Sequence, residues 1–158
     1  MEIRFLKKES QEIDETISKI IKVCEINNLY LLLSDKILFD NVFYQNGIYE
    51  FSIWYSNVED FVFASGSIFN EQLSYDILID ESYSFYILKI EVIYKDIFFT
   101  NLEMKLLLDF CIEFLTINNY LIVENVDEKS IYTLNDLITI KEKGYFKNWN
   151  HIKNEEST

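Results

Sequence analysis

The sequence predicts an α+β fold: a mainly antiparallel sheet of about five to seven strands, two main helices packed on one face, and a short C-terminal helix. Segments 10–26 and 100–117 repeat apolar residues at the spacing of a helix. The segment between them alternates apolar and polar residues at the spacing of a strand, and turn-forming residues interrupt it. We therefore expect a central antiparallel meander between the two main helices.

Length and composition favour a single folded domain. The chain has 158 residues, of which 49% are hydrophobic and 16% are aromatic. A chain of this size buries most of the surface that its unfolded form exposes, and its apolar content offsets the entropy cost of ordering. We expect one α+β domain over residues 1–153 and a frayed C-terminal tail over residues 154–158.

The N-terminal segment is predicted to form a strand, a helix and a second strand. A strand over Glu2–Leu6 precedes a helix that Ser10 is placed to cap, and carboxylates in the first turn favour that helix through its dipole. Its apolar stripe comprises Ile13, Ile17, Ile20, Ile21 and Cys24. The pair Asn27-Asn28 predicts the end of the helix because Asn tolerates the left-handed conformation, and residues 29–33 then form a strand.

The middle of the chain is predicted to form the meander. Asn46-Gly47 separates the runs 42–45 and 48–55, and this dipeptide tolerates the positive φ angles of a two-residue hairpin turn. Further alternating runs that extend the sheet are 59–65, 74–80 and 83–94. Gly66 is the predicted separator after the first of these runs.

The C-terminal segment is predicted to contain a largely buried helix, a strand and a shorter helix. Thr100 and Glu103 form a capping box at the start of the first helix, which runs to about Ile117. Its polar residues leave only a narrow strip on an apolar cylinder: Lys105, Asp109, Glu113 and Thr116. A strand over 120–124 follows, and the last helix, 135–143, ends at Gly144.

Acidic residues are concentrated in the middle of the chain. The formal net charge is -13, and no Lys or Arg lies between Lys36 and Lys89. The carboxylates of this segment are those of Asp40, Glu50, Glu59, Asp60, Glu71, Asp76, Asp80 and Glu81. An acidic surface repels nucleic acids and anionic membranes and attracts cationic partners. We therefore expect a cationic protein partner, and neither a nucleic acid nor a membrane.

No set of residues in the sequence predicts catalysis, a cofactor or a metal site. His151, the only histidine, lies near the C-terminus and is expected to belong to a partly exposed tail. Cys24 and Cys111 fall on apolar helix faces and are expected to be reduced core thiols. The glycines are too few for a phosphate-binding loop, and the adjacent carboxylate pairs lack the pattern of a calcium site.

The chain is expected to be cytoplasmic. Residues 1–6 lack the basic start and the continuous apolar run of a secretory signal. The longest uncharged runs, 61–70 and 114–123, are half as long as the ~20 residues needed to span a bilayer. No transmembrane helix is predicted.

One face of the predicted sheet combines carboxylates with large apolar side chains. If Phe51 faces the helices, then Glu50 and Trp54 face the other way, because side chains alternate along a strand. On the last long strand, Phe85 and Ile87 share that face. The predicted partner-binding residues are Asp40, Tyr44, Glu50, Trp54, Glu59, Asp60, Asp76, Asp80, Glu81 and Phe85. The alternatives are a solvated face, or one covered by the C-terminal helix or by a second subunit.

In its overall character the chain resembles the bacterial immunity proteins of contact-dependent and polymorphic toxin systems. The resemblance covers the whole chain and rests on its small size, its acidic segment 40–81 and its lack of a catalytic set. Such proteins bind the catalytic domain of a toxin, often a basic nuclease, and block or distort its active site. The resemblance implies that the carboxylates pair with Lys and Arg of the toxin, while Tyr44, Trp54 or Phe85 supply desolvated anchors.

Two other functions stand beside this one. A secretion chaperone is also small and acidic, but it acts as a homodimer, so a monomer favours the immunity protein. A small enzyme that relies on carboxylates and tyrosines would show a deep pocket with raised carboxylate pKa values. We expect a monomeric binding protein and not an enzyme.

Overall fold

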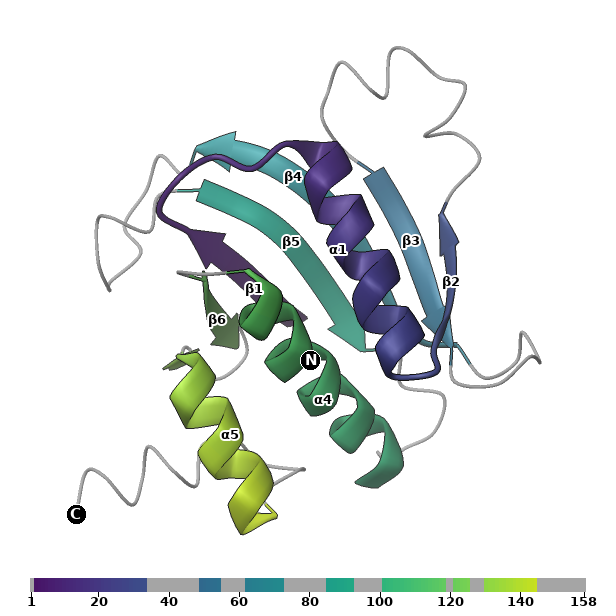
Figure 1. Cartoon of the computed structure of the whole chain (residues 1–158), viewed down its shortest axis with the longest axis vertical. Coiled ribbons are helices and arrows are strands. Elements are labelled where there is room, and N and C mark those ends of the chain that lie inside the picture. The colour runs from purple at the N-terminus through teal and green to yellow at the C-terminus, as the bar shows by residue number, and fades with distance from the viewer. Residues whose placement is uncertain are drawn as a thin grey trace.

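The computed structural model describes residues 2–33, 49–54, 62–72, 85–92, 101–118, 121–125 and 130–144. In chain order the elements of these residues are β1 (Glu2–Lys7), α1 (Ile13–Ile26), β2 (Tyr30–Leu33), β3 (Tyr49–Trp54), β4 (Val62–Gln72), β5 (Phe85–Val92), α4 (Asn101–Ile117), β6 (Leu121–Asn125), β7 (Ser130–Tyr132) and α5 (Leu134–Lys143). The strands form one antiparallel sheet in the order β2-β3-β4-β5-β1-β6-β7, and α1, α4 and α5 lie on one face of it (Figure 1). The α+β class, with its main helices on one face, is thereby confirmed.

The pairing of the strands confirms the central meander. β2, β3, β4 and β5 follow one another both along the chain and across the sheet. β1 then lies between β5 and β6, so the N-terminal strand is an interior strand. The predicted Asn46-Gly47 turn, the run 42–45 and the strand over 74–80 lie outside the described residues. The sequence does not predict β7, which pairs with β6 at the end of the described sheet.

A cluster of buried apolar side chains joins the helices to the sheet. Phe114 of α4 is one of its fully buried members. Its ring packs edge-on against Phe5 of β1, with ring centroids 5.0 Å apart, and stacks with Phe110 at 5.9 Å. The contact with Phe5 joins α4 to β1, whereas the contact with Phe110 lies within α4 itself. Edge-on and stacked ring pairs both add to the free energy of apolar burial.

The polar strip of α4 lies partly against α5. Most of α4 is buried, as predicted, whereas Lys105 and Thr116 on the strip are exposed. Lys141 Nζ of α5 lies 2.7 Å from Asp109 Oδ1 on the same strip, so an ion pair joins the two helices. α5 ends at Gly144, whose φ of 74° is in the left-handed region, and this confirms the predicted C-cap.

Two asparagines end the main helices in the same way. Asn27 Nδ2 donates to the Val23 carbonyl at 3.0 Å, and Asn118 Nδ2 donates to the Phe114 carbonyl at 2.9 Å. Each carbonyl also accepts from the backbone N–H of the same asparagine at 3.1 Å, so the side chain adds a second hydrogen bond to the last turn of the helix. Asn28 has a φ of 54°, so the chain leaves α1 through the left-handed conformation that the sequence predicts there.

The start of α1 differs from the prediction. The helix begins at Ile13, and Glu12 is its N-cap residue, so the prediction that Ser10 caps this helix is wrong. The prediction that Ile21 belongs to the buried stripe is also wrong, because this side chain is 40% exposed. The buried face is centred on Ile20 and continues toward the C-terminal half of the helix, whereas Ile21 is turned about 100° away from it.

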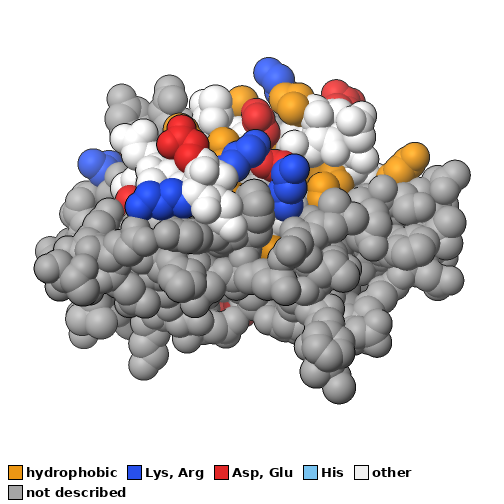
Figure 2. All heavy atoms as spheres, turned by 90° about the horizontal axis from the view of Figure 1, so that it is seen from below, with side chains coloured by type: hydrophobic (Ala, Val, Ile, Leu, Met, Phe, Trp, Pro, Cys, Tyr) orange, Lys and Arg blue, Asp and Glu red, His pale blue; other side chains and the backbone are white. Residues whose placement is uncertain are grey.

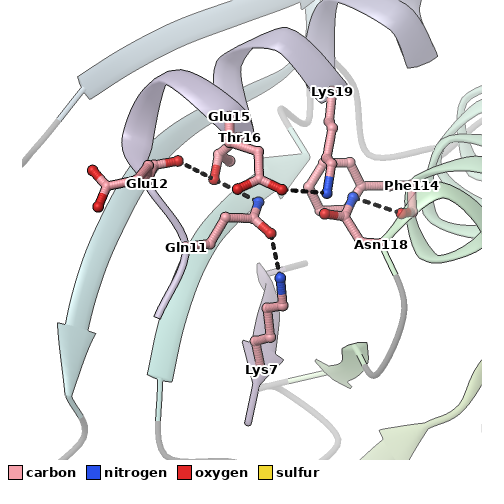
Figure 3. Close-up of polar contacts among 8 residues, drawn as sticks. All are labelled: Lys7, Gln11, Glu12, Glu15, Thr16, Lys19, Phe114 and Asn118. Atoms are coloured by element: carbon pink, nitrogen blue, oxygen red, sulfur yellow. Dashed lines mark hydrogen bonds and ion pairs between the residues drawn. The ribbon is translucent and has the colours of Figure 1, made fainter. Parts of the chain in front are cut away.

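A chain of polar contacts accounts for the late start of α1 (Figure 3). Lys7 Nζ donates to Gln11 Oε1 at 2.7 Å, and Gln11 Nε2 donates to Thr16 Oγ1 at 2.8 Å. Gln11 and Thr16 are both buried, although both are polar. A buried amide requires hydrogen-bond partners, so these bonds hold residue 11 against the first turn and outside the helix.

Replacing Thr16 with Val should lower the free energy of unfolding by about 1–3 kcal/mol, because the buried Gln11 Nε2 then loses this acceptor. The two side chains have nearly the same shape, so packing is conserved. Thr116→Val is the matched control: its Oγ1 donates to the Ile112 carbonyl at an exposed site, and we expect a change below about 0.5 kcal/mol. Urea unfolding measures both variants. A Thr16→Val protein as stable as the wild type would contradict the role given to Gln11.

β4 continues through Gly66, so the prediction that Gly66 separates two strands is wrong. Gly66 pairs with Phe51 of β3 and with Ile90 of β5. A Cβ atom at this position would overlap the ring of Phe51 and would lie 2.7 Å from the Lys89 carbonyl oxygen. Glycine is required here because the ring of the neighbouring strand fills the space of a side chain.

Candidate functional site

The candidate site is the face of the sheet opposite the helices, here called the outer face. Residues directly opposite each other in an antiparallel pair share one face. Ile53 and Ala64 are such a pair and are both buried, whereas the next pair, Ser52 and Ser65, is partly open to solvent. The outer-face residues whose side chains the structure describes are Glu2, Arg4, Tyr30, Leu32, Glu50, Ser52, Ser65, Ser67, Lys89 and Glu91. All of them are partly or fully exposed.

On the β5–β1 half of the outer face, positive and negative charges compensate each other. Arg4 and Lys89 are directly opposite in the register of β1 and β5. Glu2 lies between them, with Oε2 3.0 Å from Arg4 Nε and Oε1 4.0 Å from Lys89 Nζ. Lys89 Nζ also lies 3.4 Å from Glu91 Oε1. Each cation of this half therefore has a carboxylate beside it.

The β2–β3 half of the outer face has a different character. Glu50 is exposed and lies opposite Ser67, and no Lys or Arg of the described residues forms an ion pair with it. Leu32 is 55% exposed and Tyr30 is 47% exposed. Leu32 pairs with Ser52, whose side chain is small. This half thus combines an exposed carboxylate with exposed apolar groups.

The structure places only part of the predicted partner-binding set. Glu50 is on the outer face, and Trp54 holds an outer-face position because it pairs with Tyr30. Phe85 begins β5, is half-buried and packs against the core, so little of its surface remains for a partner. The predicted residues that lie outside the described part of the chain are Asp40, Tyr44, Glu59, Asp60, Asp76, Asp80 and Glu81, together with His151.

The prediction that Ile87 lies on the exposed face is wrong, because its side chain is fully buried. Simple alternation fails at this point of β5. Leu88 pairs with Phe5 of β1, but the next pair is Tyr86 with Leu6, so the register slips by one residue at Ile87. A register slip of this kind is a β-bulge, which turns a side chain away from its expected face. As a result Ile87 and Leu88 are both buried.

Tyr30 and Leu32 are absent from the predicted binding set. The sequence predicts their strand but not their face, because all four residues of β2 are large and apolar or aromatic. Only the pairing of Leu31 with the buried Ile53 shows that Tyr30 and Leu32 point outward. The one local signal is the polarity of Ser52, which marks an outward position on the partner strand.

The described residues offer little for catalysis. None of them form a group of three or more His, Cys, Asp or Glu side chains that could hold a metal ion. Cys24 and Cys111 are buried free thiols, as predicted. Burial raises the pKa of Cys24 to about 12 and also raises the pKa of Cys111. A thiol that remains protonated is a poor nucleophile, so neither cysteine is a candidate catalytic residue.

We expect neither thiol to react with a disulfide reagent at about pH 8 in the folded protein, and both to react once the chain is unfolded. Because the pKa of Cys24 is raised from 9.0 to about 12, the unfolded chain releases this proton at lower pH than the folded chain. The free energy of unfolding should therefore fall as the pH rises from 9.0 to about 12. Colorimetric thiol counting with and without urea checks the first result. A fast reaction in the folded protein would contradict the burial of both groups.

No helix among the described residues is long and apolar enough to cross a membrane. In comparisons with known proteins, the chain matches no family model, no curated protein and no solved structure. The charge of the chain and the geometry of the outer face are therefore the observations that bear on function.

Proposed function

We propose that this chain is an acidic protein-binding module that acts as a cytoplasmic immunity protein, binding and neutralising a cationic toxin domain. The observation that carries the proposal is the position of the helices. α1, α4 and α5 all lie on one face of the sheet (Figure 1). The opposite face has exposed carboxylates and apolar groups. A sheet face of this composition is suited to contact with another protein.

The charge of the chain supports a cationic partner. The formal net charge is -13, and the segment between Lys36 and Lys89 contributes acidic residues without a single cation. Such a charge distribution accelerates encounter with a basic protein and disfavours wrong partners of like charge. Glu50 would then pair with Lys or Arg of the partner. Those are the residues with which a nuclease holds its phosphate substrate, so the pairing would compete directly with substrate binding.

The test is protection of growing cells. A cationic domain encoded beside the gene for this chain should arrest growth when it is expressed alone, and co-expression of this chain should restore growth. An unrelated acidic protein of similar net charge is the control, and it should give no protection. The proposal is overturned if no neighbouring gene encodes a cationic domain, or if growth arrest persists while the chain is present in folded form.

The proposal includes a monomeric chain, because a homodimer would instead favour the secretion chaperone. The exposed Tyr30 and Leu32 lie on β2, an end strand of the described sheet, where a second copy could pair edge to edge. Light scattering coupled to size exclusion separates the two functions. We expect the mass of one 19.0 kDa chain, and a stable dimer would favour the chaperone.

A further inference from the structure

We propose that the partner docks on the β2–β3 corner, defined as the outer-face residues Tyr30, Leu32, Glu50 and Ser52. The partner that fits this corner is a basic protein surface on which an apolar side chain is flanked by Lys or Arg. The inference rests on the proposed function and locates it on the molecule. The proposed apolar anchors are Tyr30 and Leu32 on β2, an end strand of the described sheet, in place of Phe85, which packs against the core.

The apolar part of the corner is a short ridge along β2. Tyr30 and Leu32 are two residues apart on one strand, so their side chains leave the same face about 7 Å from each other. Leu32 is the most exposed large apolar side chain of the described residues, at 55%. Next to it across the sheet come Ser52 and then Ser65, whose small side chains leave the flank of Leu32 open. An apolar side chain of a partner would be desolvated against this flank.

The charge of the corner is set by Glu50. It is two residues from Ser52 on the same face of β3, which places it diagonally across from Leu32, within about 8 Å. The described cations of the outer face, Arg4 and Lys89, are already paired with Glu2 and Glu91 on the other half of the sheet. Glu50 therefore attracts a cation from outside the described chain, and it does so beside the apolar ridge.

The described residues of the helical side offer no comparable surface. Its exposed apolar residues, Ile21, Ile26 and Ile138, are distributed over two helices. Figure 2 shows this side at the top, where Lys or Arg side chains lie beside Asp or Glu side chains over the helices. Ion pairs there include Lys19 with Glu15 and Lys141 with Asp109. Because both signs of charge are mixed, this side does not select a cationic partner.

A defined probe tests the corner without knowledge of the partner. The probe is a short synthetic peptide that repeats Lys-Leu-Phe-Lys, and two control peptides carry Glu in place of Lys or Ser in place of Leu and Phe. Amide chemical shifts of the isotope-labelled chain report where each peptide binds. We expect the largest shifts in β2 and β3, and weaker binding of both control peptides. Largest shifts on the helices or around Arg4 and Lys89, equal binding of a control peptide, or no binding would overturn the inference.

Matched variants separate the apolar contribution to binding of the probe peptide from the contribution of charge. Leu32→Ser and Glu50→Lys should each weaken binding of the probe by about tenfold or more, as expected for a central interface residue. The controls make the same changes on α5, where Ile138→Ser and Glu142→Lys should leave binding unchanged. Thermal unfolding of each variant confirms that it is folded. Loss of binding in the controls, or none in the corner variants, would contradict the assignment.

The same variants distinguish failure of the docking surface from failure of the proposed function. If the cationic toxin domain binds the wild type and the corner variants equally, the docking surface is wrong and the proposed function stands. If the peptide binds at the corner but the chain neither binds nor neutralises the cationic domain, the proposed function is wrong and the surface stands.

Discussion

Replacing Gly66 with Ala is expected to lower the free energy of unfolding by about 3 kcal/mol, the upper part of the range for an overpacked core. The added Cβ would overlap the ring of Phe51 and would lie 2.7 Å from the Lys89 carbonyl oxygen. Neither neighbour moves easily, because Phe51 is buried and Lys89 is part of the ladder between β4 and β5. Chemical unfolding in urea measures the loss.

Two further variants make the Gly66 result specific. Ser67→Ala adds no atoms at the next position of β4 and should change stability by less than about 0.5 kcal/mol. Phe51→Leu in the Gly66→Ala background removes the ring that the new methyl group meets, so part of the lost stability should return. If Gly66→Ala is as stable as Ser67→Ala, the ring does not fill the space above Gly66.

Replacing Phe114 with Ala should cost about 3–5 kcal/mol, the usual cost of removing a buried aromatic side chain. Phe114 is fully buried and contacts two other rings, those of Phe5 and Phe110. The cavity would open between α4 and β1, so the helix would lose its ring contact with Phe5 on that interior strand. Unfolding in denaturant measures this loss of stability. The slope of the free energy of unfolding against denaturant concentration should be the same in both proteins, which checks that the unfolded state has not changed.

The matched control for Phe114 lies on the same helix. Ile112 is only partly buried, so Ile112→Ala should cost clearly less than Phe114→Ala, about 1 kcal/mol. Phe114→Leu keeps most of the apolar volume and should recover part of the loss. Equal destabilisation by the Ile112 and Phe114 variants would contradict a core organised around the ring contacts.

The sequence predicts the elements of this fold well where local signals decide them. The narrow polar strip of Lys105, Asp109, Glu113 and Thr116 predicts a mostly buried helix, and α4 is such a helix. Gly144 marks the end of α5 because glycine readily adopts the left-handed conformation, in which its N–H donates to the carbonyls of Ile140 and Lys141. The alternation in β3 places Phe51 and Ile53 inward correctly, since no bulge intervenes between them.

Specific side-chain contacts explain two failures of the sequence predictions. Ser10 is a good capping residue by type, but the hydrogen bonds that Gln11 accepts from Lys7 and donates to Thr16 hold residue 11 outside the helix. Gly66 resembles a strand separator until its neighbour across the sheet, Phe51, is known. The contacts of Gln11 are with residues four and five positions away, and the contact of Gly66 is across the sheet. No recurring residue pattern marks either contact in the sequence.

The candidate site could be predicted only in part for the same reason. Alternation along β3 gives Glu50 and Trp54 their outer-face positions. Tyr30 and Leu32 require the register between β2 and β3, because a strand made only of large apolar residues has no polar side to reveal its orientation. Ile87 requires knowledge of the bulge in β5.

The decisive measurement for the proposed function is the affinity of the purified chain for the cationic domain encoded beside it, at low and at physiological ionic strength. We expect a complex at both ionic strengths, with an association rate that falls several-fold at the higher one, because exposed carboxylates steer the encounter. Absence of a complex at low ionic strength, or an association rate that does not change with salt, would contradict the proposed function.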